Sequence, residues 1–329
     1  MSLMSSALQP PFARPPSTVA IRRASNYQAD LAKLISETLS ELGIAVRGKS
    51  VLLKPNFVEP DPDGVINTHP AVVSAARESF LRLGAREVKV GEGPGHERDT
   101  EAILETIRLR EYLGPLPGVF VDLNLDDVAQ IALRTRASSL REIYFPKTVL
   151  KADFVVSMPK LKTHHWVGAT LSLKNMFGIV PGSCYGWPKN ALHWAGITPA
   201  ILDINGTVRP DFAIVDGIVG MEGNGPIQGA AKPCGILVMG DDPVAVDATC
   251  ARVMGLAPER IDYLKKAGSL LGHLNREQIR QLGETIESVR TPFAVLDTFR
   301  RLRDKWHGLP ARAATSSSKL ARPNSDGNH

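Results

Sequence analysis

The sequence has few cysteines, and this scarcity excludes two kinds of protein. Cys184, Cys234 and Cys250 are the only cysteines in 329 residues, and none forms a CxxC pair. A ferredoxin-type cluster needs four thiolates at short spacings, so this chain builds no iron–sulfur cluster alone. A disulfide framework is not expected from an odd number of cysteines in a long chain. We therefore expect free thiols in a reducing cytoplasm.

Aromatic residues, concentrated charge and long apolar runs are also scarce. Aromatics make up 6% of the chain and the net charge is +5. Nucleic-acid binders more often combine a basic face with aromatics, so we expect no nucleic-acid partner. No stretch approaches the ~20 apolar residues that span a bilayer, and residues 1–18 lack the apolar centre of a signal peptide. We expect a cytoplasmic protein with no transmembrane segment and with disordered tails at 1–18 and 309–329.

Apolar segments of strand length alternate with segments of helical periodicity. Residues 50–56, 70–83 and 87–91 form a strand–helix–strand unit, with Pro70 in the first helical turn and Gly84 just past the helix. Further strands are expected at 19–22, 118–122, 154–157, 212–215 and 235–239, and further helices at 27–42, 102–113 and 242–254. This alternation predicts an α/β fold over residues 19–286: a mainly parallel sheet with flanking helices and Rossmann-like βαβ units. One lobe or two, with a boundary near residue 150, remain open.

Apolar residues recur at three- and four-residue steps near the C-terminus. They are Phe293, Leu296, Phe299, Leu302 and Trp306. This spacing predicts an amphipathic helix over residues 287–308. We expect it to dock on the core; a membrane surface or a partner is the alternative target.

The run of residues 158–182 is the richest in chemistry. It follows an apolar segment, 152–157, that is typical of a buried strand, and it contains Lys160, Lys162, His164, His165, Lys174 and Asn175. Open α/β sheets place their ligands at such strand ends, where crowded titratable groups are candidates for proton transfer. Apolar neighbours surround Lys174, and this lowers a lysine pKa and favours a nucleophile or tether. His165 should point away from His164 on an extended backbone.

Two further loops follow predicted strands and should converge on the same edge of the sheet. One carries Lys54 and Asn56; the other carries Gly91, Gly93, Gly95 and His96. The glycines allow the backbone to approach an anion or cofactor closely. His96 stands where the GxGxxG pattern needs glycine, so a dinucleotide fingerprint is not predicted.

Several motifs together resemble a large prokaryotic family, the domain of unknown function 362, over about residues 51–272. They are Lys54-Pro-Asn56, Gly91-Glu-Gly93, Met158-Pro-Lys-Leu-Lys-Thr-His164, Ser172-Leu-Lys-Asn175 and Gly240-Asp-Asp-Pro-Val-Ala-Val-Asp247. The resemblance implies relatives with a fused ferredoxin module or an export signal, and we expect neither in this chain.

The order of strand, Thr-His-Pro helix, glycine-rich loop and lysine-bearing run is also similar to the lactate racemase family. This remote resemblance implies that Lys174 tethers a nickel-pincer nucleotide and that His193 ligates the nickel. It further implies that His96 and His164 are the acid/base pair and that Lys54 lies in a binding region for substrate or cofactor. The other cofactor-binding candidates are Lys160, Lys162, Asn175, Gly91, Gly93 and Gly95.

These observations predict an enzyme that acts on a small anionic substrate through a lysine and histidine pocket. The expected activity is that of an isomerase of racemase or epimerase type, or of an oxidoreductase. Two alternatives stay open. One is an accessory electron-transfer or binding protein with a separate iron–sulfur protein as partner; the other is a phosphate-binding module without catalysis.

Overall fold

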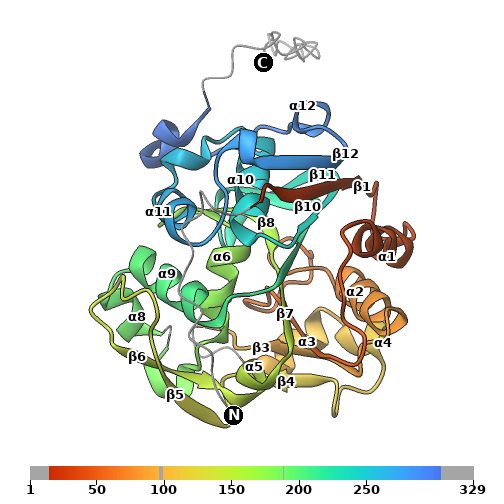
Figure 1. Ribbon diagram of the computed structural model, residues 1–329, viewed down its shortest axis with the longest axis vertical. Helices are drawn as coiled ribbons and strands as arrows, with labels where there is room; N and C mark the ends of the chain where they lie inside the picture. The colour runs from red at the N-terminus through yellow and green to blue at the C-terminus, as the bar shows by residue number, and fades with distance from the viewer. Residues whose placement is uncertain (1–14, 96–98, 188, 305–329) are drawn as a thin grey trace, which may run out of the picture.

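The computed structural model describes residues 15–95, 99–187 and 189–304, which are built around a ten-stranded sheet (Figure 1). The strand order is β12-β1-β11-β10-β7-β2-β3-β4, and β8 and β9 extend from β10. The strands are β1 (Ser17–Arg23), β2 (Ser50–Pro55), β3 (Glu87–Glu92), β4 (Phe120–Asp122), β7 (Phe154–Met158), β8 (Lys160–His164), β9 (Gly168–Thr170), β10 (Phe212–Asn224), β11 (Gln228–Gly240) and β12 (Ile279–Gly283). A separate hairpin pairs β5 (Val128–Ala132) with β6 (Glu142–Pro146).

The predicted α/β fold with a mainly parallel sheet is confirmed. The pairs β2–β3, β2–β7, β3–β4, β7–β10, β8–β10 and β1–β12 are parallel. The pairs β1–β11, β10–β11 and β8–β9 are antiparallel. Strands β2 and β7 lie on opposite sides of residue 150 in the sequence and are direct neighbours in this sheet.

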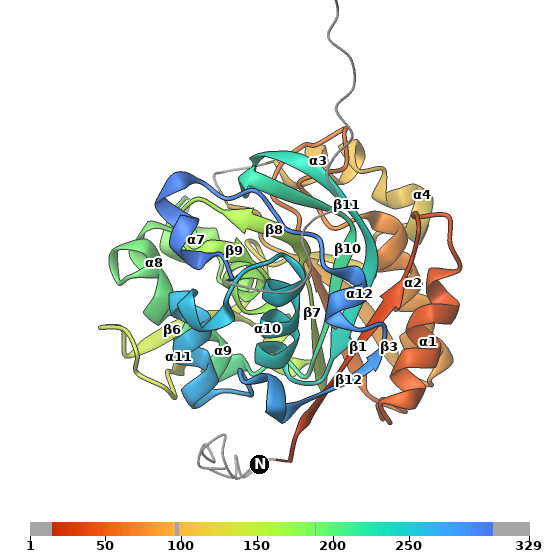
Figure 2. The same cartoon turned by 90° about the horizontal axis from the view of Figure 1, so that it is seen from above.

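Helices cover both faces of the sheet. The α-helices are α1 (Leu31–Glu41), α2 (Pro70–Arg82), α3 (Thr100–Thr106), α4 (Leu109–Leu113), α5 (Lys147–Lys151), α6 (Ser172–Asn175), α7 (Gly182–Tyr185), α8 (Asn190–Trp194), α9 (Ile197–Val208), α10 (Pro243–Val253), α11 (Asp262–Leu270) and α12 (Ile286–Val289). Short 3-10 helices are η2 (Met176–Ile179), η3 (Pro258–Arg260), η4 (Arg276–Gln278) and η5 (Asp297–Leu302). Figure 2 shows α1, α2 and α4 on one side of the sheet and α9, α10 and α11 on the other.

Alternate residues of the central strands enter two separate apolar cores. In β2, Leu52 packs into the core beside α9, α10 and α11, whereas Val51 and Leu53 pack into the core beside α1 and α2. Successive side chains of a strand point to opposite faces of the sheet. When both faces are covered, nearly every residue of the strand is therefore apolar. The segment 50–56 was recognisable as a buried strand for this reason.

Local capping explains why the clearest helices begin where the sequence predicts. Helix α2 starts at Pro70, where the His69 side chain accepts a hydrogen bond from the Ala71 N–H. Helix α10 starts at Pro243, and the Asp242 carboxylate accepts from the backbone N–H groups of Val244 and Ala245. Caps of this kind satisfy N–H groups that have no partner inside the helix.

Three expectations need correction. The helix expected over 102–113 is two helices, α3 and α4, because Arg108 between them has a φ of 58°. The single helix expected over 287–308 is, within the described residues, α12, an extended segment and η5; Pro292 restrains the preceding residue from helical geometry. Residues 17 and 18, expected to belong to the N-terminal tail, are the first two residues of β1, and residues 1–14 lie outside the described structure. The tail at 309–329 lies outside the described residues.

Across the three described stretches of the chain, we find no helix with the length and apolar character needed to cross a membrane.

Candidate functional site

A cavity of about 810 Å³ opens at the carboxyl ends of β2 and β3 and along β8. Its lining includes four lysines and three histidines: Lys54, Lys162, Lys174, Lys189, His164, His165 and His193. The loops after β2 and β3 therefore meet the run of residues 158–182, as the parallel arrangement predicts. Asn56, Glu92, Gly93, Gly95, Thr170 and Asn175 also line the cavity.

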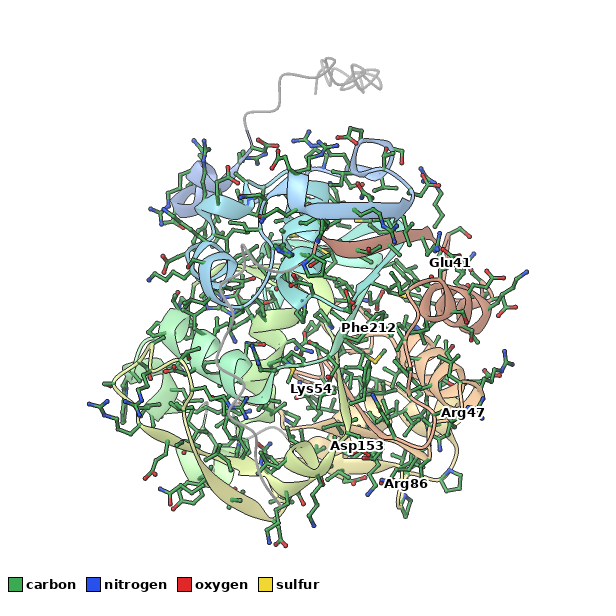
Figure 3. All side chains as sticks on the ribbon, in the orientation of Figure 1. Glu41, Arg47, Lys54, Arg86, Asp153 and Phe212 are labelled. Carbon is green, nitrogen blue, oxygen red and sulfur yellow. The ribbon has the colours of Figure 1, made fainter. Side chains whose placement is uncertain are left out.

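Lys54 is held in a buried ion pair. Its Nζ lies 2.7 Å from Oε1 of Glu92 and also donates to the Pro55 carbonyl at 2.8 Å and to Asn175 Oδ1 at 3.3 Å. Burial lowers the pKa of Lys54, and the Glu92 carboxylate opposes this effect. The Lys54 side chain is fully buried and lies near the centre of the view in Figure 3. It links the carboxyl ends of β2 and β3 to the end of α6.

Two further lysines donate to backbone carbonyls. Lys162 Nζ donates to the carbonyls of Ile66 at 2.8 Å and Pro226 at 3.2 Å. Lys189 Nζ donates to the carbonyls of Gly93 at 2.8 Å and Gly178 at 3.0 Å. Burial lowers the pKa of each of these lysines to about 7.

Lys174 is different from the other three lysines. Its Nζ lies 4.4 Å above the ring of Phe177, and among the described residues no carboxylate or carbonyl accepts a hydrogen bond from it. Burial and the nearby Lys54 charge lower its pKa to about 8. Its helix, α6, is fixed by Asp247, whose carboxylate accepts from the N–H groups of Ser172 at 2.8 Å and Leu173 at 3.0 Å. The backbone of α6 is therefore anchored, and the Lys174 ammonium lies over the Phe177 ring at the cavity.

The two adjacent histidines both line the cavity, contrary to the expectation that His165 points elsewhere. Nδ1 of His164 accepts from the Trp166 N–H at 3.0 Å, so the proton of the neutral ring is on Nε2. Nδ1 of His165 lies 2.8 Å from the Gly225 carbonyl, an acceptor only, so this nitrogen carries the proton and Nε2 the lone pair. Burial and the Lys174 charge hold the pKa of His164 well below its usual range. One ring offers a donor and the other an acceptor.

His193 belongs to an aromatic group at the same cavity. Its ring centroid lies 5.4 Å from that of Trp166 and 5.3 Å from that of Phe177, and its Nδ1 lies 3.1 Å from the Lys189 carbonyl. Within residues 15–95, 99–187 and 189–304, no group of three His, Cys, Asp or Glu side chains is arranged to hold a metal ion. A metal at His193 would therefore need most of its donors from a ligand.

Three predicted site residues fall outside this cavity lining or outside the described structure. Lys160 is fully buried in an ion pair with Asp216, 3.0 Å away, and does not line the cavity. Gly91 packs between Leu52 and Leu123, so its small size serves packing rather than ligand approach. His96 lies outside the described residues.

Gly93 and Asn175 do fit the predicted region. A Cβ on Gly93 would lie 2.7 Å from the Gly178 carbonyl oxygen, so only glycine permits this close approach. The Asn175 amide donates to the Lys54 carbonyl at 2.9 Å and to Ser157 Oγ at 3.0 Å, which braces the end of α6.

The family of this chain follows from sequence comparison. Residues 51–252 match the family described as Domain of unknown function (DUF362). The chain belongs to this family. All the residues that line the cavity lie between Lys54 and Gln228, inside the matched segment. A thylakoid-associated protein of Synechocystis is 30% identical over 256 residues, which cover 74% of this chain and 76% of that protein.

Two solved structures show more distant similarity. The lactate racemase apoprotein from Thermoanaerobacterium thermosaccharolyticum has 15% identity and a TM-score of 0.42, over 73% of this chain and 58% of that chain. A protein from Thermotoga maritima has 14% identity and a TM-score of 0.36, over 67% of this chain and 57% of that chain. This chain therefore spans less than two thirds of either protein.

Sequence reasoning missed Lys189 and Glu92 as part of this DUF362 cavity. Glu92 was visible only as the middle residue of Gly91-Glu-Gly93, yet it accepts from Lys54 and from the N–H groups of Phe57 and Gly93. No motif in the sequence marks Lys189 as a site residue, and its φ of 68° places it in the left-handed region. Only the folded chain turns it inward.

Proposed function

We propose that this DUF362 domain is an enzyme that binds a small anionic substrate in the cavity, with Lys174 as its reactive amine. The observation that carries the proposal is the contrast among the four lysines. Lys54, Lys162 and Lys189 donate to protein oxygens, whereas Lys174 has no such acceptor in the described chain. A lysine with a lowered pKa beside unused space is suited to binding an oxyanion or to nucleophilic attack.

The two histidines supply complementary proton chemistry. His164 presents Nε2–H and can donate a hydrogen bond to the substrate, while His165 presents a lone pair at Nε2 and can accept a proton. This arrangement supports a racemase, an epimerase or an oxidoreductase acting on a small acid. In this proposal His164 is the hydrogen-bond donor and His165 the base; His96, which the sequence predicts as an acid/base residue, lies outside the described residues.

A lysine-tethered nucleotide-type cofactor is the finer form of the proposal. The cavity volume of about 810 Å³ and the Lys174 amine with a pKa of about 8 fit a covalent tether. His193 would contribute a nitrogen donor to a nickel ion, with the other donors coming from the cofactor. Bound there, such a group would hold the hydride removed from a 2-hydroxy acid.

Intact mass and elemental analysis of protein purified from its native host test the tether. An adduct that maps to Lys174, together with stoichiometric nickel, would support it. An unmodified mass without metal would rule out the tether and leave a reversible anion site. Lys151 is the matched control, because it is an exposed lysine at the end of α5 and should carry no adduct.

A second candidate function is that of an accessory protein for a separate iron–sulfur partner in the cytoplasm. Trp194, at the end of α8, favours it because its side chain is 82% exposed next to His193. Large exposed aromatics often mark contact surfaces. Co-purification with a ferredoxin that is lost in Trp194→Ala, while substrate turnover is absent, would support this function over the first.

A further inference from the structure

The β8–β9 hairpin places polar side chains in the cavity lining in addition to that of Lys174. The antiparallel register pairs Lys162 of β8 with Thr170 of β9, and both residues line the cavity together with His164. Directly opposed residues of antiparallel strands leave the same face with Cβ atoms about 5 Å apart. His164 lies two residues beyond Lys162 and therefore shares that face.

Thr170 carries a buried hydroxyl group that the described residues leave without a partner. Its side chain is 4% exposed, and none of them forms a hydrogen bond with its Oγ1. Thr163, on the opposite face of the same hairpin, donates instead to the Gly223 carbonyl at 2.9 Å. A buried hydroxyl without a partner is a standing cost to stability, so an unsatisfied one beside a cavity points to a ligand atom that satisfies it.

The side chains on this face offer hydrogen-bond donors. Lys162 uses two of its three N–H groups on the carbonyls of Ile66 and Pro226, which leaves one within the described structure. His164 presents Nε2–H because its Nδ1 is already occupied. The Glu92 carboxylate is engaged by Lys54 and by two backbone N–H groups. The Asp61 carboxylate, whose charge acts on Lys162, accepts from the Ile66 N–H, and Glu59 also lines the cavity. Three hydrogen-bond donors on one face suit an oxyanion.

We propose that Thr170, Lys162 and His164 form an oxyanion subsite in which a ligand oxygen accepts a hydrogen bond from the Thr170 hydroxyl. This inference rests on the proposed function, since it names the residue that recognises the anionic group held near Lys174. Rotation about the Cα–Cβ bond of threonine moves the hydroxyl among three staggered positions, so the hydroxyl can turn to the ligand without backbone movement. Carboxylate and phosphate oxygens offer the same acceptor chemistry.

Three variants separate ligand recognition from folding. Thr170→Val removes the hydroxyl at nearly constant volume, Thr170→Ser restores a hydroxyl, and Thr163→Val removes a hydroxyl that has a protein partner. Binding of inorganic phosphate and of malonate is measured by calorimetry on the full chain, with the Tm of each protein. Malonate represents a carboxylate ligand and phosphate a phosphorylated one.

Thr170→Val should weaken the binding of the anion that the wild type binds by about tenfold or more, the loss typical of a hydrogen bond to a charged group. Its Tm should stay equal to or above that of the wild type, and Thr170→Ser should bind nearly as the wild type does. Thr163→Val should lower the Tm, because it removes the hydrogen bond to the Gly223 carbonyl, and should leave anion binding unchanged. Preference for malonate or for phosphate identifies the class of oxyanion.

Unchanged affinity in Thr170→Val, with wild-type binding intact, would overturn the subsite alone. A fall in Tm as large as that of Thr163→Val would assign Thr170 a structural role and overturn it as well. If the wild type binds neither anion, the anionic cavity itself is refuted, and with it the proposed function.

Discussion

Lys160 and Lys174 belong to the same run of sequence, but they meet opposite surroundings. Lys160 Nζ lies 3.0 Å from the Asp216 carboxylate and 2.8 Å from the Tyr27 hydroxyl, deep in the protein. Lys174 Nζ faces the cavity and contacts the Phe177 ring, with no carboxylate partner in the described chain. The hydrogen-bond and ion-pair partners of a lysine, rather than its burial alone, separate a structural lysine from one available for chemistry.

The largest expected effect comes from removing the partner of Lys160. Asp216 also accepts from the Tyr27 hydroxyl at 3.1 Å and from the His69 N–H at 3.0 Å, so Asp216→Ala leaves several buried donors unpaired. We expect the free energy of unfolding to fall by about 3–5 kcal/mol, as when one partner of a buried ion pair is removed. Urea denaturation measures this change.

The matched control is Asp127→Ala, which removes the partner of exposed Lys147 and should cost less than about 1 kcal/mol. Adding Lys160→Met to Asp216→Ala should recover part of the loss, because the uncompensated charge is gone. If Asp216→Ala and Asp127→Ala lowered the free energy of unfolding equally, the structural role of the buried Lys160–Asp216 pair would be contradicted.

Lys174→Met should weaken anion binding and leave the free energy of unfolding nearly unchanged, in contrast with Asp216→Ala. It removes three N–H donors that no described residue uses, so anion binding should weaken by about 10- to 100-fold, the loss expected for hydrogen bonds to a charged group. The free energy of unfolding should change by less than about 1 kcal/mol, because a methionine sulfur can replace the ammonium on the Phe177 ring and no hydrogen bond to a described residue is lost. Calorimetry and urea denaturation together measure both quantities. Intact binding with reduced stability would make Lys174 a structural residue.

The pH dependence of stability sharpens the same contrast. The pKa of Lys174 is about 8 in the folded protein, below the ordinary value of about 10.4 for an unfolded chain. Between these values the unfolded state binds more protons, so this lysine makes stability rise with pH from about 8 to about 10.4. We expect about 1–2 kcal/mol from this group, since it is partly exposed in the cavity. Lys174→Met should remove that part of the rise, and unfolding curves at pH 7 and pH 10 test it; identical slopes in both proteins would contradict the lowered pKa.

The predictable and the unpredictable parts of the site differ in the range of their contacts. Strand β2, helix α2 and the apolar surroundings of Lys174 could be predicted because periodicity, caps and neighbours in sequence determine them. The roles of Lys160 and Thr170 could not. Asp216 is 56 residues from Lys160, and the Thr170 hydroxyl is notable only because folding leaves it without a partner. Such contacts depend on which strands pair, and the residues next to Lys160 and Thr170 in the sequence do not indicate that pairing.

The smallest expected effect concerns which nitrogen of each histidine carries the proton. His164 accepts from the Trp166 N–H through Nδ1, whereas His165 faces the Gly225 carbonyl through Nδ1, so the neutral rings are opposite tautomers. Nitrogen chemical shifts from long-range ¹H–¹⁵N spectra should show the proton on Nε2 of His164 and on Nδ1 of His165. His164→Asn and His165→Asn provide the assignments. Because burial and the Lys174 charge keep the pKa of His164 well below its usual range, its ring should remain neutral at pH 6, and Lys174→Met should raise that pKa. The same tautomer in both rings would remove the donor and acceptor pair on which the proton chemistry of this cavity depends.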